Sequence, residues 1–194
     1  MPVQFHIDGV QLHRLTVHAD DRGSFTEIFS TGWNAVGIEP AQWSLVESRP
    51  GTLRGMHLHR RHDELFCVVR GRAWVGLRDI RPGSPTEGTS MLLELDNSEL
   101  TALIFPRGIV HGWYFREHVM HLQSVSEPYS IYGDDDNLGC NWSDPDLGID
   151  WPDTPVRVSQ RARNFPSLGT LIRETLRRDP GFSYQNLTRC LQSV

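Results

Sequence analysis

The sequence contains little cysteine, and its three cysteines lie far apart. Cys67, Cys140 and Cys190 form no Cys-x-x-Cys pair, and their number is odd. This spacing argues against a disulfide framework and against a thiolate zinc site. It favours reduced thiols in a cytoplasmic protein.

Long apolar runs and an excess of basic charge are also lacking. No apolar run approaches the roughly 20 residues that cross a bilayer, and residues 1–15 lack the basic start and apolar core of a signal peptide. Lysine and arginine number 19 against 24 acidic residues, a net charge of −5. We therefore expect a cytoplasmic protein that binds neither membrane nor nucleic acid. Local basic residues could still hold a phosphorylated small molecule.

Short alternating segments dominate the 194 residues, a length that suits one domain with its own core. Residues 10–29 predict two strands around a turn at Asp20–Gly23, and residues 64–80 predict a hairpin that turns at Arg70-Gly71. Further strands are expected at 90–96, at 101–106 and within 109–126. Short strands separated by Gly, Pro, Asp and Asn predict an all-β sandwich or barrel.

The C-terminal part departs from this alternation. Apolar or small side chains recur there at helical spacing, and Pro180-Gly181 ends the pattern: Leu168, Leu171, Ile172, Thr175 and Leu176. We expect residues 1–165 to form the β-barrel domain and residues 166–194 a helical tail packed on the same domain. The last dozen residues carry no assignment.

A histidine-rich stretch runs from Arg54 to Gly71. His57 and His59 lie two apart, so a strand would present both on one face. Glu64 follows, and a distant Pro-x-Gly-x-x-His motif ends at His111. Together these segments resemble both halves of the cupin signature, which implies a jelly-roll barrel. The four side chains could bind Fe, Mn, Zn, Ni or Co; the alternative is that they are solvated loop residues.

Longer motifs resemble one cupin branch, the dTDP-4-dehydrorhamnose 3,5-epimerase family. They follow one another in order over most of the chain: DDRGSFTEIF (20–29), GTLRGMH (51–57), DIRPGSPTEG (79–88), PRGIVHGW (106–113) and WSDPDLGIDWP (142–152). Such enzymes invert stereocentres beside the C4 ketone of a 4-keto-6-deoxy sugar nucleotide. The resemblance implies a nucleotide-sugar substrate, no required cofactor, and a homodimer in which the N-terminal strand of one subunit completes the site of the other.

The resemblance also assigns roles to residues. His57 matches the base that removes the α-proton, and Asp144 matches the aspartate that holds this base. Arg54 matches an arginine that meets the diphosphate. The other matched substrate-binding positions are Arg22, Glu27, Gln42 and His111.

Three positions depart from the family pattern. Glu64 replaces a lysine, and Ser44 replaces an asparagine of the nucleotide pocket. The catalytic tyrosine, which is the acid on the opposite face, falls on Gln123 or Ser124, and neither is a useful acid near neutral pH. Tyr129 or Tyr132 could substitute for it.

The replacement of lysine by glutamate suggests that a metal supplies the missing positive charge. The ligands of this metal would be His59, Glu64 and His111. His57 would be either a fourth ligand or the base, because one lone pair cannot serve both roles.

Three functions stay open. The first is epimerisation at C3, C5 or both, or a 3,4-keto shift. The second is a metal-dependent oxygenase or lyase, and the third is a non-catalytic sugar-nucleotide-binding protein.

Overall fold

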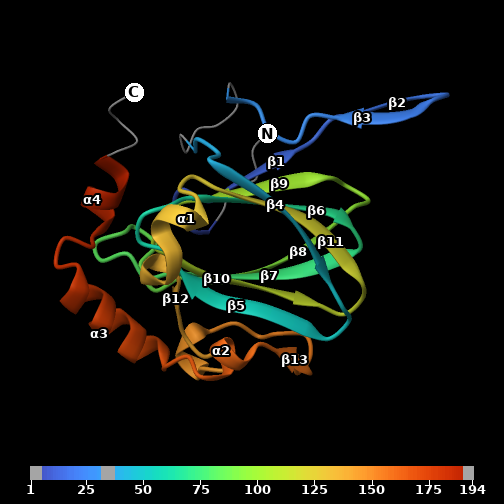
Figure 1. Cartoon of the computed structure of the whole chain (residues 1–194). Coiled ribbons are helices and arrows are strands. Elements are labelled where there is room, and N and C mark those ends of the chain that lie inside the picture. Colours follow the sequence, from blue (N-terminus) through green and yellow to red (C-terminus); the bar gives the residue numbers. More distant parts are fainter. Residues whose placement is uncertain (1–5, 32–37, 190–194) are drawn as a thin grey trace.

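The computed structural model describes residues 6–31 and 38–189, so that Cys190 and the chain ends lie outside the described residues. Two antiparallel sheets face each other (Figure 1). This arrangement confirms the predicted all-β, cupin-like fold. Within the described ranges, no helix is both long enough and apolar enough to cross a membrane.

One sheet has the order β1–β9–β6–β11–β4. Its strands are β1 (Gln11–Arg14), β9 (Thr101–Phe105), β6 (Glu64–Arg70), β11 (Val119–Val125) and β4 (Gln42–Ser48). A separate hairpin, β2 (Val17–Asp20) and β3 (Gly23–Thr26), confirms the predicted turn and projects from the body of the molecule (Figure 1).

The other sheet has the order β12–β5–β10–β7–β8, with β13 beside β5. Its strands are β12 (Leu138–Gly139), β5 (Thr52–Leu58), β10 (Ile109–Phe115), β7 (Arg72–Asp79), β8 (Ser90–Asp96) and β13 (Arg157–Val158). The helical segments are α1 (Tyr129–Tyr132), η2 (Gly133–Asp136), η3 (Pro145–Leu147), α2 (Gln160–Arg163), α3 (Leu168–Arg178) and α4 (Tyr184–Arg189).

The hairpin predicted at Arg70-Gly71 is wrong. Strand β6 pairs with β9 and β11, whereas β7 pairs with β10 and β8 in the facing sheet. Gly71 has a φ of +79°, and a Cβ there would lie 2.7 Å from the carbonyl oxygen of His118. The turn therefore needs a glycine, but it carries the chain from one sheet to the other.

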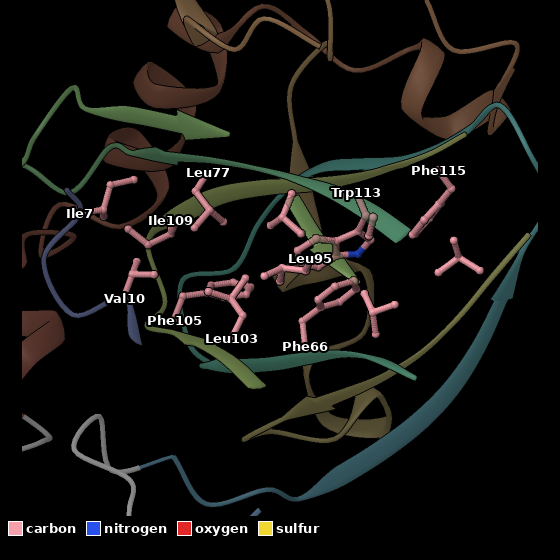
Figure 2. Close-up of a cluster of buried hydrophobic side chains, with 14 residues drawn as sticks. Ile7, Val10, Phe66, Leu77, Leu95, Leu103, Phe105, Ile109, Trp113 and Phe115 are labelled. Atoms are coloured by element: carbon pink, nitrogen blue, oxygen red, sulfur yellow. The ribbon is translucent and has the colours of Figure 1, made fainter. Parts of the chain in front are cut away.

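Apolar side chains fill the space between the two sheets (Figure 2). Phe66 of β6 stacks on Trp113 of β10, with ring centroids 4.3 Å apart, and Leu77 and Phe105 lie fully or almost fully buried in the same cluster. This packing joins the faces of the two sheets. It thereby fixes the strands that carry Glu64 and His111 relative to each other.

The helix predicted in the C-terminal tail is present as α3. Its Leu168 and Leu171 are buried against Met56 and Leu58 of β5, as the helical spacing of apolar residues requires. Helix α4, in contrast, was not predicted, because its six residues lack an apolar period. The division at residue 165 stays a prediction.

The first turn of α3 offers a test of this packing. The Ser167 hydroxyl accepts a hydrogen bond from the Thr170 amide at 3.3 Å. We expect Ser167→Ala to lower the free energy of unfolding by about 1 kcal/mol, because one helix amide loses its cap. Urea unfolding measures this change. Ser24→Ala, at an exposed serine of β3, should change it by less than about 0.5 kcal/mol, and equal stability of the two variants would contradict the capping role.

Candidate functional site

Three strand ends bring the histidine-rich stretch together. His57 lies near the end of β5, and its Cα pairs with that of His111 on β10, next to a bulge between His111 and Gly112. His59 follows β5 directly, and Glu64 is the first residue of β6 in the facing sheet. The site therefore lies at one end of the sandwich, between the end of β5 and the starts of β6 and β10.

Three of the four predicted metal ligands converge, and His57 does not join them. The Nε2 atoms of His59 and His111 lie 2.9 and 3.4 Å from the same Glu64 oxygen, Oε1, and all three residues are buried. The His57 ring lies further out, with its centroid 6.3 Å from that of His59 and 6.1 Å from that of His111. The four-ligand set is thus corrected to His59, Glu64 and His111, which we call the histidine–glutamate cluster.

Backbone carbonyls fix the tautomers of both cluster histidines. Nδ1 of His59 lies 2.5 Å from the Asp136 carbonyl oxygen, and Nδ1 of His111 lies 3.0 Å from that of Ile109. A carbonyl can only accept, so each Nδ1 must carry the proton. In the neutral rings the two Nε2 lone pairs therefore point at Glu64. Metal-bound histidines are commonly oriented in this way.

Glu64 brings negative charge to the same point. Burial by itself opposes its ionisation, but His111 and His59 in their protonated forms outweigh burial and lower the pKa of this carboxyl well below its usual range. Its Oε2 accepts a hydrogen bond from Gln123 at 2.7 Å. Its Oε1 is buried and accepts no hydrogen bond from the described residues.

This donor set fits a divalent metal. When both rings are neutral, two nitrogen lone pairs and a carboxylate oxygen face one another, and a cation would stabilise this arrangement. Ligands about 2.0–2.2 Å from a metal lie roughly 2.9–3.5 Å from each other, and the separations of 2.9 and 3.4 Å match this range. Fe, Mn, Zn, Ni and Co all accept such ligands.

Asp136 holds His59 on the side of the ring that faces away from Glu64. The sequence analysis did not identify this residue. Its carboxylate accepts hydrogen bonds from the amides of Arg60 and Arg61 at 2.8 and 2.9 Å, while its carbonyl accepts the His59 proton. The carboxylate also lies 3.3 Å from Nδ1 of His62. The run of three aspartates at 134–136 was the only sequence signal for this role.

His62 lies between two carboxylates. Burial lowers its pKa, but the Asp136 and Glu64 carboxylates outweigh this effect and raise the pKa to about 8. Its ring stacks on Tyr132, with centroids 4.2 Å apart. His59, His62 and Asp136 form a second group with metal-ligand spacing, although the Nδ1 of His59 already faces the Asp136 carbonyl.

His57 is half-buried and lines a cavity of 430 Å³ beside Arg54. Phe165 meets its ring edge-on, with centroids 5.8 Å apart. Burial, together with His111 and His59, lowers the pKa of His57 to about 3. The ring is thus neutral near neutral pH, and a neutral imidazole can accept a proton.

Asp144 does not hold His57 in this structure. Its Oδ1 accepts the Asp146 amide at 2.9 Å and caps η3, and its Oδ2 accepts the Leu168 amide at 2.7 Å. In the described part of the chain, neither a hydrogen bond nor an ion pair joins Asp144 to His57. The expected dyad is corrected, because this carboxylate closes two backbone turns.

The predicted substrate-binding residues lie in several places. Arg54 lines the cavity with His57. Gln42 accepts the Tyr129 amide at 2.9 Å, at the end of β4. Arg22 lies at the tip of the projecting hairpin, where it pairs with Asp20, and Glu27 follows β3 (Figure 1). Within one chain the structure does not bring Arg22 and Glu27 to His57.

The replacements of the family tyrosine lie beside the histidine–glutamate cluster. Gln123 donates to Glu64, and Ser124 is buried. Tyr132 is the phenol next to the cluster, with its ring centroid 5.8 Å from that of His59. Burial, reinforced by Glu64, raises the pKa of Tyr132 to about 12, so this phenol stays protonated. Tyr129 is more exposed and bonds Asp134.

Known proteins share both the sequence and the fold. The chain is 32% identical over 169 residues to a dTDP-4-dehydrorhamnose 3,5-epimerase of Sinorhizobium fredii, covering 82% of this chain and 85% of the relative. It is 31% identical over 149 residues to the spore coat polysaccharide biosynthesis protein SpsL of Bacillus subtilis, covering 71% and 97%.

A solved structure and a family model agree with these relatives. The crystal structure of ChmJ, a 3'-monoepimerase from Streptomyces bikiniensis in complex with dTDP-quinovose, superposes with a TM-score of 0.81 at 27% identity, covering 97% of this chain and 96% of that one. Residues 4–170 match the family model described as dTDP-4-dehydrorhamnose 3,5-epimerase. The chain belongs to the dTDP-4-dehydrorhamnose 3,5-epimerase family.

Proposed function

We propose that the protein epimerises a dTDP-4-keto-6-deoxyhexose at C3, or at C3 and C5, with His57 as the base. The observation that carries this proposal is the position of His57. Its neutral ring lines a ligand-sized cavity and stands apart from the histidine–glutamate cluster, so its lone pair is not engaged there. This position supports His57 as the base rather than as a fourth metal ligand.

The reaction moves one proton out and one proton back. His57 takes the hydrogen of the carbon beside the C4 ketone, and the electron pair of that C–H bond becomes an enolate whose charge rests on the C4 oxygen. A proton delivered to the opposite face of the carbon restores the ketone with inverted configuration. Tyr132 is the protonated phenol beside the cluster, and we assign it as the candidate donor.

His57 works without a carboxylate partner in this arrangement. Phe165 packs against the ring edge-on, so packing rather than Asp144 sets its orientation. Without an Asp144 contact to His57, and with Glu64 in place of the family lysine, the site lacks two groups that support enolate formation. Compensation must therefore come from elsewhere in the site.

The histidine–glutamate cluster is proposed to hold a divalent metal that provides this compensation. The family itself requires no cofactor, and the chain contains no lysine at all. His59, Glu64 and His111 would bind the metal, and Gln123 and the carbonyls of Asp136 and Ile109 would orient them. A bound divalent metal supplies Lewis-acid stabilisation to a developing negative charge.

We also propose a homodimer in which the projecting hairpin completes the partner's site. Arg22 and Glu27 lie on or beside this hairpin, which projects away from β5, the strand that carries His57 (Figure 1). Phe25 of β3 and Leu45 of the edge strand β4 expose 64% and 63% of their surface, and exposed apolar residues on an edge strand favour a partner. A cytoplasmic location agrees with the buried free thiols of Cys67 and Cys140.

Solvent exchange tests the proposed reaction. The protein is incubated with dTDP-4-keto-6-deoxyglucose in D₂O, and deuterium at C3 and C5 is measured by mass spectrometry and NMR. We expect incorporation at C3, with or without C5. Tight dTDP binding without incorporation at either carbon would instead support the non-catalytic reading, and turnover that requires Fe(II) and O₂ would support an oxygenase.

The proposed assembly has its own prediction. Light scattering should give twice the chain mass, and Leu45→Glu should shift the protein toward the monomer, because a charge would be buried in an apolar contact. Leu176→Glu, on the outer side of α3 and exposed to 38%, is the matched control and should leave the mass unchanged. A monomeric wild-type protein that retains full activity would contradict the shared site.

A further inference from the structure

His62 is a buried histidine to which the proposed reaction gives no role. It lies in the loop between β5 and β6, and only 1% of its surface is exposed. Its Nδ1 lies 3.3 Å from a carboxylate oxygen of Asp136, and its Nε2 lies 3.7 Å from Oε1 of Glu64. A side chain so fully buried does not touch a substrate. Any contribution to the reaction must therefore pass through the residues that His62 contacts.

The His62 ring packs against two other rings. Its centroid lies 4.0 Å from that of His59 and 4.2 Å from that of Tyr132, with interplanar angles of 31° and 29°. The centroids of His59 and Tyr132 are 5.8 Å apart, so the three rings form a compact triangle. One corner is a proposed metal ligand and another is the proposed proton donor. His62 is the corner that joins them.

The segment that carries Tyr132 depends on contacts with the loop of His62. Helix α1 buries none of its residues, and among residues 6–31 and 38–189 no hydrogen bond engages the Tyr132 hydroxyl. The Asp63 carbonyl accepts the Ser126 amide at 3.0 Å, and the Asp63 amide donates to the Ser126 hydroxyl at 2.9 Å. These bonds hold the two segments together, and the stacked ring of His62 restricts the phenol, because aromatic pairs prefer defined orientations.

We infer that His62 is a positioning residue that sets the orientation in which the Tyr132 phenol delivers its proton to the sugar. The inference rests on the proposed function and deepens it. Proton removal by His57 does not involve His62, whereas proton return to the opposite face depends on the orientation of Tyr132. A misplacement of about 1 Å can cost on the order of a hundredfold in rate, so loss of the His62 ring should impair proton return far more than proton removal.

Deuterium labelling separates the two steps. In D₂O, the proton that leaves C3 passes to His57 and exchanges with solvent. The enolate then takes a deuteron from His57, which gives labelled substrate, or from the Tyr132 hydroxyl, which gives labelled product with inverted configuration. In the second case, the phenolate recovers a deuteron from solvent. NMR and mass spectrometry at early times give the partition ratio, which is labelled substrate divided by inverted product.

His62→Gln keeps N–H groups that can donate to both carboxylates but removes the ring. We expect the partition ratio to rise about tenfold or more, while the loss of hydrogen from C3 slows by less than about threefold. Tyr132→Phe should raise the ratio similarly, and the double variant should raise it no further, because both changes remove the same proton delivery. His62→Phe restores an aromatic ring and should return the ratio to within about threefold of the wild type.

The matched control is His121→Gln. His121 is equally buried but packs on Phe66 and Phe115, so the ratio should not change. The ratio compares two products of the same active molecules, so a partly unfolded variant still reports it. A wild-type ratio in His62→Gln would overturn this inference and leave the proposed reaction intact. A rise in His62→Gln without one in Tyr132→Phe would overturn the link between the two residues. A wild-type protein that exchanges no deuterium would overturn the proposed reaction, and this inference with it.

Discussion

His57→Asn is expected to slow deuterium incorporation at C3 by roughly 10²–10⁴-fold, the range over which a positioned general base contributes to rate. Asparagine keeps the approximate size of the side chain but cannot take a proton. Binding of dTDP should stay within about threefold of the wild type, because Arg54 and the rest of the cavity are intact. Mass spectrometry of the sugar over time measures the exchange rate, and calorimetry measures the binding.

The matched control is His118→Asn. His118 is an exposed histidine whose ring lies 3.5 Å from the Glu47 carboxylate and does not line the cavity, so the exchange rate should not change. If His57→Asn kept the wild-type rate within about threefold, another residue would have to be the base. A rate lost together with dTDP binding and thermal stability would point to a damaged fold and would count against a purely chemical role.

Glu64→Gln is expected to abolish metal binding without harming the metal-free fold. The wild type, purified without added metal, should contain about one equivalent of a transition metal, and the variant less than a tenth of an equivalent, because an uncharged amide is a poor ligand. Elemental analysis by mass spectrometry measures both. A wild-type content below a tenth of an equivalent would rule out the metal proposal.

The melting temperatures of the metal-free proteins distinguish a loss of metal binding from a loss of folding. In the metal-free wild type with both rings neutral, the ionised Glu64 faces two nitrogen lone pairs that offer it no proton. The glutamine amide could donate to both rings, so the variant should melt at or above the temperature of the chelator-treated wild type. Adding metal should raise the melting temperature of the wild type only. Glu47→Gln, at an exposed glutamate of β4, should behave like the wild type in both assays.

Local patterns predicted most strands of the fold but not how the strands pair. Strand-like segments bounded by turn residues located β8, β9, β10 and β11, and the last three bury most of their residues in the sandwich. The Arg70-Gly71 turn was misread, since a hairpin and a crossing between sheets both require a tight glycine turn. The sequence does not show which sheet a strand joins, because that choice depends on packing such as Phe66 on Trp113.

The candidate site was predictable where spacing alone determines it. The separation of His59 and Glu64, with a distant His111, identified three residues that the structure brings together. His57 was harder to place, because the alternation of a strand says nothing about the bulge beside its partner. Asp144 precedes a proline at the start of a helical turn, which is a capping signal, and in the structure its carboxylate caps η3.

The position of Arg157 in the lining of the His57 cavity could not have been found from local patterns. Arg157 reaches the cavity because the two-residue strand β13 lies parallel to β5, a contact between segments far apart in the chain. Two-residue strands leave no periodic signal in a sequence.

Asp136 makes the histidine stretch depend on a remote part of the chain. One residue positions three consecutive ones, through the ring of His59 and the amides of Arg60 and Arg61. Transplanting residues 54–71 into another barrel would therefore not carry the binding geometry along, unless the short acidic turn at 133–136 were transplanted as well. For protein engineers, the portable unit is this pair of segments rather than the histidine motif.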